Sequence, residues 1–382
     1  MQGKGNKTVR RGFALVMVLF IIMAIAVLAV GFLSRSDVEL ACGQNMILKT
    51  QMDYLAESAL EHAKGLILNP QDVNSEYWTG ATRQQLSAGS SDYYDVSVTK
   101  LGELDYQITS TAYREKGGEQ VGRSSLKAKL RLNPCIAIRT GGPWTTEPVT
   151  TVNGDVYVKG DLKSNGGIIN GDAFATGSIS ALNILGQKYA KIADSNAPVS
   201  FPGLQISYFS PRYYIGSYSY SPGSIAGDIS NVTLGPTASN PAGVYYYDGN
   251  STLSGNVIVT GTLVVKGDLK IKGWGNSITA AKNFPALIVG GRVEMYNNAQ
   301  LTVTGLAQIK NEIEHFDFAG ARLNIYGALF IENDNMDEFD TGDIINITAV
   351  PDKAAIEIWL ADGTAQRWSP AAGAFFKEIK RQ

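Results

Sequence analysis

An uncharged run of 21 residues, from Phe13 to Leu33, limits most strongly what this chain can fold into. As a helix the run is about 30 Å long, which matches the hydrocarbon core of a bilayer. Four cations and no acid precede it, whereas Asp37 and Glu39 follow it closely. By the positive-inside rule, the N-terminus is cytoplasmic and the rest of the chain lies outside. The sequence therefore predicts a single-pass membrane protein.

The run is not typical of a cleaved secretory signal. Such signals have a shorter apolar region that ends in a cut site of small-x-small form. The triplet of that form, Ala24-Ile25-Ala26, lies in the middle of the run, and the apolar residues continue beyond it. A plain, uncut signal-anchor remains an alternative at this point.

An amphipathic pattern continues directly from the apolar run. No proline occurs between Ser36 and Leu66. Apolar residues at helical spacing form one stripe: Val38, Ala41, Leu48, Met52, Leu55, Ala59 and Leu66. Nothing interrupts the junction at Leu33-Ser34, so we predict one continuous helix from Phe13 to about Leu66, about 80 Å long. The alternative is a separate helix that packs on its own domain.

A short basic leader, a Gly-Phe junction, an apolar half-helix and an amphipathic half-helix follow one another in this order. The stretches RGFALVMVLF and YLAESALEHAKGLI carry the pattern. Residues 8–132 thereby resemble the type IV pilin family, in particular PilX-type minor pilins and the K-type minor pseudopilin of type II secretion. The resemblance implies that prepilin peptidase cuts between Gly12 and Phe13, and that Phe13 becomes the methylated N-terminal residue. Glycine suits this position because an approaching active site needs unobstructed backbone.

One residue departs from the family pattern. Most pilins have a glutamate at the fifth mature position, where this chain has Met17. In the family, that carboxylate is thought to neutralise the N-terminal amine of the adjoining subunit, and a buried charge needs such a partner. A subunit without it is expected where no subunit sits ahead of it, as in the K-type pseudopilin. The resemblance therefore implies a subunit at the filament tip.

Beyond Pro70 the pattern changes from helix to strand. Residues 94–98, 104–112 and 124–132 alternate apolar and polar side chains, and turn-forming connectors separate them. Three antiparallel strands with one face on the helix predict a small α+β head.

Glycine-punctuated strands fill the chain from Pro134 onward. The stretch VNGDVYVKGDL at 152–162 returns as GNVIVTGTLVVKGDLKI at 255–271. Similar strands follow at 285–294, 299–309 and 321–331. This periodicity is typical of a solenoid, and we predict a mainly-β, right-handed parallel β-helix. An antiparallel β-sandwich is the alternative. Similar arrays occur in bactofilin-like polymers and in the C-terminal halves of some PilX-type proteins.

The predicted organisation has five parts. They are a prepilin leader at 1–12, a transmembrane half-helix at 13–33, the amphipathic half-helix and head at 34–132, the β-helix at 135–350 and a C-terminal cap at 351–382. A Tyr-rich segment at about 182–244 interrupts the β-helix. We interpret it as an excursion that packs on the solenoid flank, and a stacking surface for sugars or partner proteins is the alternative. Four aromatic residues are expected to cap the last rung and cover its open edge: Trp359, Trp368, Phe375 and Phe376.

Residues 333–343 form an acidic segment rich in oxygen ligands, of the kind that calcium prefers. The candidate ligands are Asp334, Asp337, Glu338, Asp340 and Asp343. Their spacing is not that of an EF-hand, and a solvated acidic loop is the alternative. Calcium is the one cofactor that the sequence suggests.

Composition argues against several functions. A formal net charge of -2 gives no reason to expect nucleic acid as a partner. The motif GxxxxGK[ST] does not occur, so energy for assembly must come from partners. Asp155, Asp161 and Asp268 follow glycines and have the positions of turn residues. No carboxylate pair is marked out by its spacing for glycoside hydrolysis. Cys42 and Cys135 lie in distant segments, so the sequence neither predicts nor excludes a disulfide between them.

We therefore predict a non-enzymatic minor pilin or pseudopilin of a type IV pilus or type II secretion-like filament. Its expected partners are other pilins, the inner-membrane assembly platform, prepilin peptidase and surface glycans. Its expected course runs from the bacterial inner membrane, through the periplasm, to a filament tip or the cell surface. The helix anchors the protein, and the β-helix serves adhesion, priming or partner contact. The alternative is a membrane-anchored cell-envelope β-helix enzyme that acts on polysaccharide.

Overall fold

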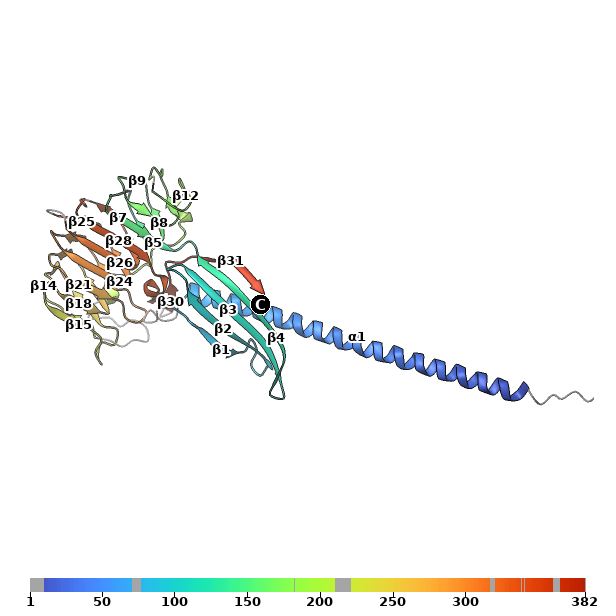
Figure 1. Cartoon of the computed structure of the whole chain (residues 1–382). Helices are drawn as coiled ribbons and strands as arrows, with labels where there is room; N and C mark the ends of the chain where they lie inside the picture. The colour runs from blue at the N-terminus through green and yellow to red at the C-terminus, as the bar shows by residue number, and fades with distance from the viewer. Residues whose placement is uncertain are drawn as a thin grey trace, which may run out of the picture.

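The structure is a computed structural model that describes residues 10–70, 77–181, 183–209, 221–316, 320–337, 339, 341–359 and 365–381. It has three parts in line: a long helix, a small antiparallel sheet against the end of that helix, and a parallel β-solenoid of about 9 turns (Figure 1). The predicted fold class is confirmed. The solenoid strands pair in parallel, which excludes the antiparallel sandwich.

Helix α1 (Arg10–Leu68) is uninterrupted over 59 residues, or about 88 Å. Its side chains are exposed from Phe13 to Ile47, and the sheet covers the helix only beyond Leu48. The buried apolar positions are Met52, Leu55, Ala56, Ala59, Leu60, Ala63 and Ile67. The continuous helix is as predicted. Val38 and Ala41 of the predicted stripe are exposed because no described strand reaches them.

The head sheet has five antiparallel strands in the order β1-β2-β3-β4-β31. They are β1 (Gly80–Gln84), β2 (Asp92–Lys100), β3 (Asp105–Lys116), β4 (Glu119–Leu132) and β31 (Ala374–Arg381). Alternate side chains of the central strands, such as Tyr106 and Ile108, are fully buried against α1. This alternation is what the sequence pattern predicted for three of the five strands.

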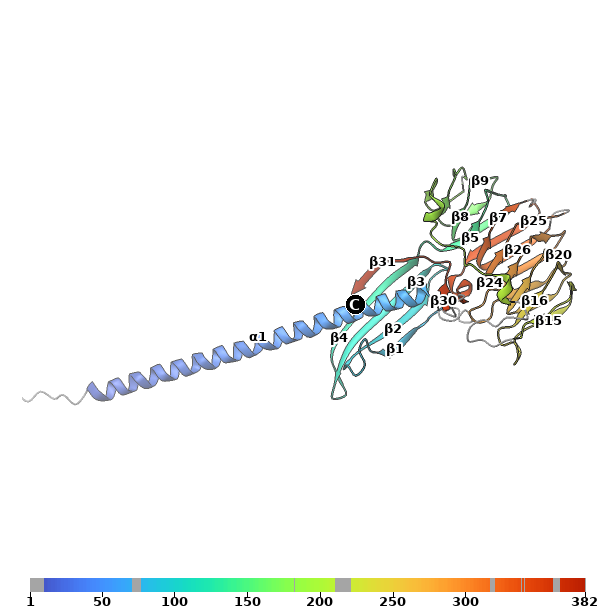
Figure 2. The same cartoon turned by 180° about the vertical axis from the view of Figure 1, so that it is seen from behind.

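The C-terminal boundary differs from the predicted one. Residues 351–382 were expected to cap the solenoid, but Phe375 and Phe376 lie in β31, which pairs with β4 of the head. The side chain of Phe376 packs on the head core, and Lys64 of α1 lies over its ring. The solenoid is therefore an insertion between two neighbouring strands of the head sheet, and the chain returns to end beside α1 (Figure 2).

Each solenoid turn crosses three faces. Face 1 contains β5 (Ile136–Thr140), β8 (Asp155–Val158), β11 (Ala173–Ala175), β12 (Lys188–Tyr189), β13 (Gly223–Ser224), β16 (Val244–Tyr247), β19 (Thr262–Val265), β22 (Leu287–Val289) and the second halves of β24 (Gln300–Ile309) and β26 (Arg322–Ile331). Its central strands β8, β19 and β22 are buried on both sides, and their side chains are mostly apolar. The end strands β12 and β13 are exposed or half-buried.

The other two faces each have one side toward solvent. Face 2 contains β14 (Asp228–Ile229), β17 (Ser251–Leu253), β20 (Leu269–Ile271), β23 (Val293–Met295), β25 (Ile313–His315), β27 (Met336–Asp337), β6 (Trp144–Thr146) and β9 (Leu162–Ser164). Face 3 contains β15 (Val232–Leu234), β18 (Val257–Thr260), β21 (Asn276–Thr279), the first halves of β24 and β26, β28 (Ile344–Ala349), β7 (Thr150–Asn153) and β10 (Ile168–Ile169).

The rungs do not stack in chain order. Strand β5, the first of the solenoid, lies between β8 and the much later β26. From β5 the chain winds outward to β12, then crosses to the opposite end and winds back from β13 to β26. The first and last turns therefore meet in the middle of the solenoid, where Leu329 pairs with Ile138.

The crossing segment explains part of the predicted Tyr-rich excursion. It includes the short helices η1 (Asp194–Asn196) and η2 (Ile206–Phe209) and packs on face 1. Residues 223–247 instead form regular solenoid strands, so the excursion is shorter than predicted. Residues 210–220, which hold four of its tyrosines, lie outside the described residues.

Cation–π contacts and a hydrogen bond hold this segment in place. The guanidinium of Arg139, which is buried, lies 4.2 Å from the ring centroid of Phe201 and 4.6 Å from that of Tyr157. Trp368 donates a hydrogen bond from Nε1 to the carbonyl oxygen of Ser200 at 3.1 Å and packs edge-on against Phe330. Trp368 thus covers the flank of the solenoid rather than its last rung. It ends the hairpin of β29 (Ile356–Trp359) and β30 (Ala365–Trp368).

A buried hydrogen bond joins the head to the solenoid. Helix α2 (Pro351–Ala354) follows the last rung, and the hydroxyl of Tyr106 in β3 donates to Oδ2 of Asp352 at 3.1 Å. Both side chains are buried. Burial raises the pKa of Asp352 to about 7, although the Tyr106 hydrogen bond opposes the shift.

This shift predicts a pH dependence of stability. Because the folded pKa lies above the unfolded value of 3.8, the free energy of unfolding falls as pH rises from about 4 to about 7, by up to about 4 kcal/mol. In Asp352→Asn the decline is expected to be lost, because the amide keeps an acceptor for Tyr106 but does not ionise. Urea unfolding between pH 4 and 8 measures it. Asp228→Asn, at an exposed position, should retain the decline. An unchanged pH profile in Asp352→Asn contradicts the prediction.

Candidate functional site

The N-terminal half of α1 is a bare apolar rod. In the described part of the chain, α1 is the one helix that is long and apolar enough to cross a membrane. The segment that meets this criterion begins at Phe13. None of its apolar side chains up to Leu33 is buried. The other half of the same helix forms the core of the head. A rod of this length requires an apolar environment, because so much exposed apolar surface is unfavourable in water.

The predicted processing and assembly residues all lie near the start of α1, between Arg10 and Met17. Gly12 and Phe13, on the two sides of the predicted cut, both lie within the same uninterrupted helix. Phe13 is 69% exposed and Met17 is 52% exposed. The helix therefore presents the fifth position, Met17, one turn beyond Phe13 with its side chain open to a neighbour.

The predicted calcium ligands are not brought together as far as the structure describes them. Asp343 is buried; its Oδ1 accepts the backbone N–H groups of Gly320 and Ala321, and its Oδ2 lies 3.0 Å from Nδ1 of His315. Asp337 lies in β27 on face 2, in register with Glu314.

The remaining members of this set lie at the seam between turns or outside the described residues. The carbonyl oxygen of Asp334 accepts the N–H groups of Gly141 and Gly142. Glu338 and Asp340 are outside the described residues. Among the residues that are described, no group of three or more His, Cys, Asp or Glu side chains is placed to hold a metal ion. Calcium binding stays a prediction.

The turn aspartates act as corner supports. Asp155 accepts the backbone N–H groups of Cys135 and Asp172, and Asp161 accepts that of Ser178. Asp268 likewise accepts the N–H of Arg292 from the next turn, at 3.1 Å. These carboxylates satisfy backbone donors at the corners, where the strand ladders are interrupted.

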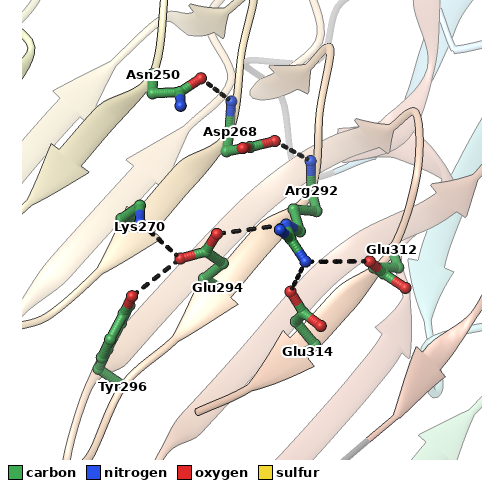
Figure 3. Close-up of polar contacts among 8 residues, drawn as sticks. All are labelled: Asn250, Asp268, Lys270, Arg292, Glu294, Tyr296, Glu312 and Glu314. Carbon is green, nitrogen blue, oxygen red and sulfur yellow. Dashed lines mark hydrogen bonds and ion pairs between the residues drawn. The ribbon is translucent and has the colours of Figure 1, made fainter.

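Face 2 carries a charged cluster that the sequence pattern did not reveal (Figure 3). Its members are Lys270, Arg292, Glu294, Tyr296, Glu312 and Glu314. Lys270, Glu294 and Glu314 occupy the same outward position on the neighbouring strands β20, β23 and β25. Alternation along each strand could have placed them outward, but their contact depends on the alignment of the turns.

The cluster is paired throughout. The carboxylate of Glu294, which is buried, lies 3.1 Å from Nζ of Lys270, 3.3 Å from Nε of Arg292 and 3.0 Å from the hydroxyl of Tyr296. Arg292 Nη1 lies 2.6 Å from Glu314 and 3.7 Å from Glu312. The attraction of Glu314 raises the pKa of Arg292, and the hydrogen bond that Lys270 donates to Glu294 raises the pKa of Lys270. Such pairing suits a polar contact surface better than acid–base catalysis, which needs a group free to exchange protons.

Face 2 lies on the side of the solenoid that is remote from α1. Its strands β14 and β25 are at the far edge in Figure 1, and β20 and β25 are at the far edge when the molecule is turned in Figure 2. The head joins the solenoid at the opposite corner, through residues 133–136 and 370–373. Cys42 is exposed on α1 and Cys135 is buried at this junction, and both are free thiols.

Comparisons with solved structures give several neighbours, of which two are described here. The DUF3494 domain of ice-binding protein 1 from Shewanella frigidimarina has a TM-score of 0.31 and 13% identity, over 56% of this chain and 94% of that one. The competence-associated pilin ComZ from Thermus thermophilus has a TM-score of 0.28 and 10% identity, over 88% of this chain and 98% of that one. No family model and no curated protein matches the sequence. Because these scores are low, the function proposed below rests on the residues of this chain.

Proposed function

We propose that this protein is a minor pilin or pseudopilin of a type IV pilus or type II secretion-like filament. The observation that carries the proposal is helix α1: one continuous helix whose first half is apolar and bare and whose second half packs on a small antiparallel sheet. The first half suits a bilayer before assembly and a bundle of equivalent helices afterwards. Four cations before Phe13 favour an N-terminus in the cytoplasm and a body in the periplasm.

The solenoid is the part that contacts other molecules outside the membrane. It is inserted at the end of the head away from the bare half of α1, so packing of the helices into a filament leaves it at the surface. We infer a non-enzymatic role in adhesion or partner contact, because the carboxylates of the face 2 cluster are paired with cations. Incubating the detergent-solubilised protein with neutral and acidic polysaccharides tests this role, since release of new reducing ends favours the enzyme alternative.

We also propose that the protein occupies the filament tip, because Met17 cannot neutralise an N-terminal amine of a subunit ahead of it. Met17→Glu is expected to move the protein from filament ends into the shaft. Gold-labelled antibody against the solenoid, counted along filaments by electron microscopy, measures the distribution. Met17→Leu preserves an apolar side chain and should keep the label at ends. Wild-type label along the whole filament contradicts the tip position.

A further inference from the structure

Face 3 carries two straight columns of outward side chains. In the first column, the strand register aligns Ser277, Thr302, Asn324, Asn346 and Thr151 on five successive strands. These strands, β21, β24, β26, β28 and β7, run side by side in Figure 1. Along each strand, the side chains at the intervening positions point inward and form the apolar core. Each column therefore contains only residues from alternate positions of its strands.

The second column lies two residues further along the same strands. It aligns Thr260, Thr279 and Thr304 on β18, β21 and β24, and continues through Tyr326. Adjacent strands are about 4.8 Å apart, and positions two apart along a strand are about 6.7 Å apart. Eight strands make face 3 about 34 Å tall, a periodic and nearly flat array rather than a pocket.

Both columns are free of charged side chains. Aspartate, glutamate, lysine and arginine do not occur within these two columns, in contrast to the ion pairs of face 2. Arg322 is exposed beside the first column, two residues before Asn324 on β26. The residues present instead carry hydroxyl and amide groups, which both donate and accept hydrogen bonds. An uncharged surface of this kind complements an uncharged ligand.

Neighbouring amides fix one another in place. Asn346 donates to Asn324 at 3.0 Å, and Asn170 donates to Asn153 at 2.7 Å. Asn153 donates to the hydroxyl of Thr348 at 3.2 Å. Because these side chains are held before a ligand arrives, less conformational entropy is lost on binding.

Apolar side chains lie within the same array. Ile258 is 46% exposed in the first column, and Tyr326 is 44% exposed in the second. They add apolar contact area, and the Tyr326 ring can stack on a sugar ring while its hydroxyl remains available. The surface of a packed neutral polysaccharide likewise presents flat apolar strips beside strips of hydroxyl groups. Face 3 therefore matches such a surface in its chemistry.

We propose that face 3 is a binding surface for a neutral crystalline polysaccharide, such as cellulose or chitin. The contact consists of many weak hydrogen bonds and apolar contacts that repeat with the strand spacing, so affinity arises from their number. This inference refines the adhesive role proposed above. The binding test is independent of filament assembly, because it uses unassembled protein. If the protein does not bind, the proposal that it belongs to a filament still holds. If the leader is not cut, the binding proposal still holds.

Sedimentation of the full chain in detergent with microcrystalline cellulose and with chitin tests the proposal. Thr302→Lys and Asn346→Lys place a charge in the middle of the array and are expected to weaken binding at least about tenfold each. Thr302→Ser keeps the hydroxyl and should bind like the wild type. Thr145→Lys makes the same change at an exposed position on face 2 and should also bind like the wild type. Thermal unfolding of each variant establishes that the solenoid is intact.

Four results overturn the proposal. The first is a wild-type chain that sediments with neither polysaccharide. The second is equal binding by the wild type, Thr302→Lys and Asn346→Lys. The third is retention of the wild type by a growing ice surface but by neither polysaccharide, which assigns the array to ordered water. Binding that soluble oligosaccharides abolish at low concentration also contradicts a surface that recognises an extended lattice.

Discussion

In a chain with Gly12→Val, the leader is expected to remain attached, and the protein should be found with Met1 still present. The resemblance to pilins places the cut between Gly12 and Phe13. A β-branched side chain there obstructs the backbone that prepilin peptidase must approach. The bare apolar half of α1 then carries a charged leader with two arginines and two lysines, which cannot enter a bundle of helices without partners. Loss of both processing and filament incorporation is therefore expected.

Mass spectrometry of the intact protein measures this outcome, since the wild type should begin at Phe13 and carry one added methyl group. Gly31→Ala is a matched control. It changes a glycine within the same apolar run, and an added Cβ there meets no other atom within 4 Å. This variant should be cut like the wild type. A wild-type chain that retains Met1 identifies the segment as a plain signal-anchor and removes the basis for the pilin proposal.

Substitution of Gly261 by valine is expected to unfold the solenoid or to destabilise it by about 3–5 kcal/mol. Gly261 lies at the corner between β18 and β19, with a φ of +137° that L-residues rarely adopt. A Cβ added there lies 2.1 Å from the carbonyl oxygen of Gly243 in the neighbouring turn. Since the obstructing atom is backbone, relief requires the turns to separate and breaks the ladder between β16 and β19.

Thermal unfolding followed by circular dichroism measures this effect. Gly89→Val is the matched control, because Gly89 has a φ of +79° in the head but an added Cβ meets no atom within 4 Å. It carries the backbone strain without the clash, so the loss should be limited to about 1–3 kcal/mol. Equal losses in the two variants contradict the close approach of turns at Gly261.

The helix and the strand type were predictable because they depend on local periodicity. The run from Phe13 to Leu33 and the stripe around Met52 define one helix, and alternation at 94–98 defines β2. Glycines at solenoid corners mark where each strand ends. The joining of β4 to β31 was not predictable, because two segments far apart in the chain meet there and either could pair elsewhere.

The candidate sites divide in the same way. Gly12, Phe13 and Met17 are read from a local segment, and the structure adds the exposure of Phe13 and Met17. Closeness in sequence was misleading for the acidic segment, because Asp343 turns inward toward His315 whereas Asp337 lies on face 2. The face 2 cluster and the face 3 columns depend on which outward residue of one turn lies above that of the next.

The sequence by itself determined the membrane-length helix, the small head and the solenoid class, since each is encoded by a repeat within a few residues. Only the tertiary structure decided that β5 sits between β8 and β26 and that the solenoid is inserted into the head sheet. The physical reason is that similar turns present similar edges, so local pattern cannot specify which turn stacks on which. Complementary packing over the whole solenoid selects one order, and that order creates the charged and uncharged faces.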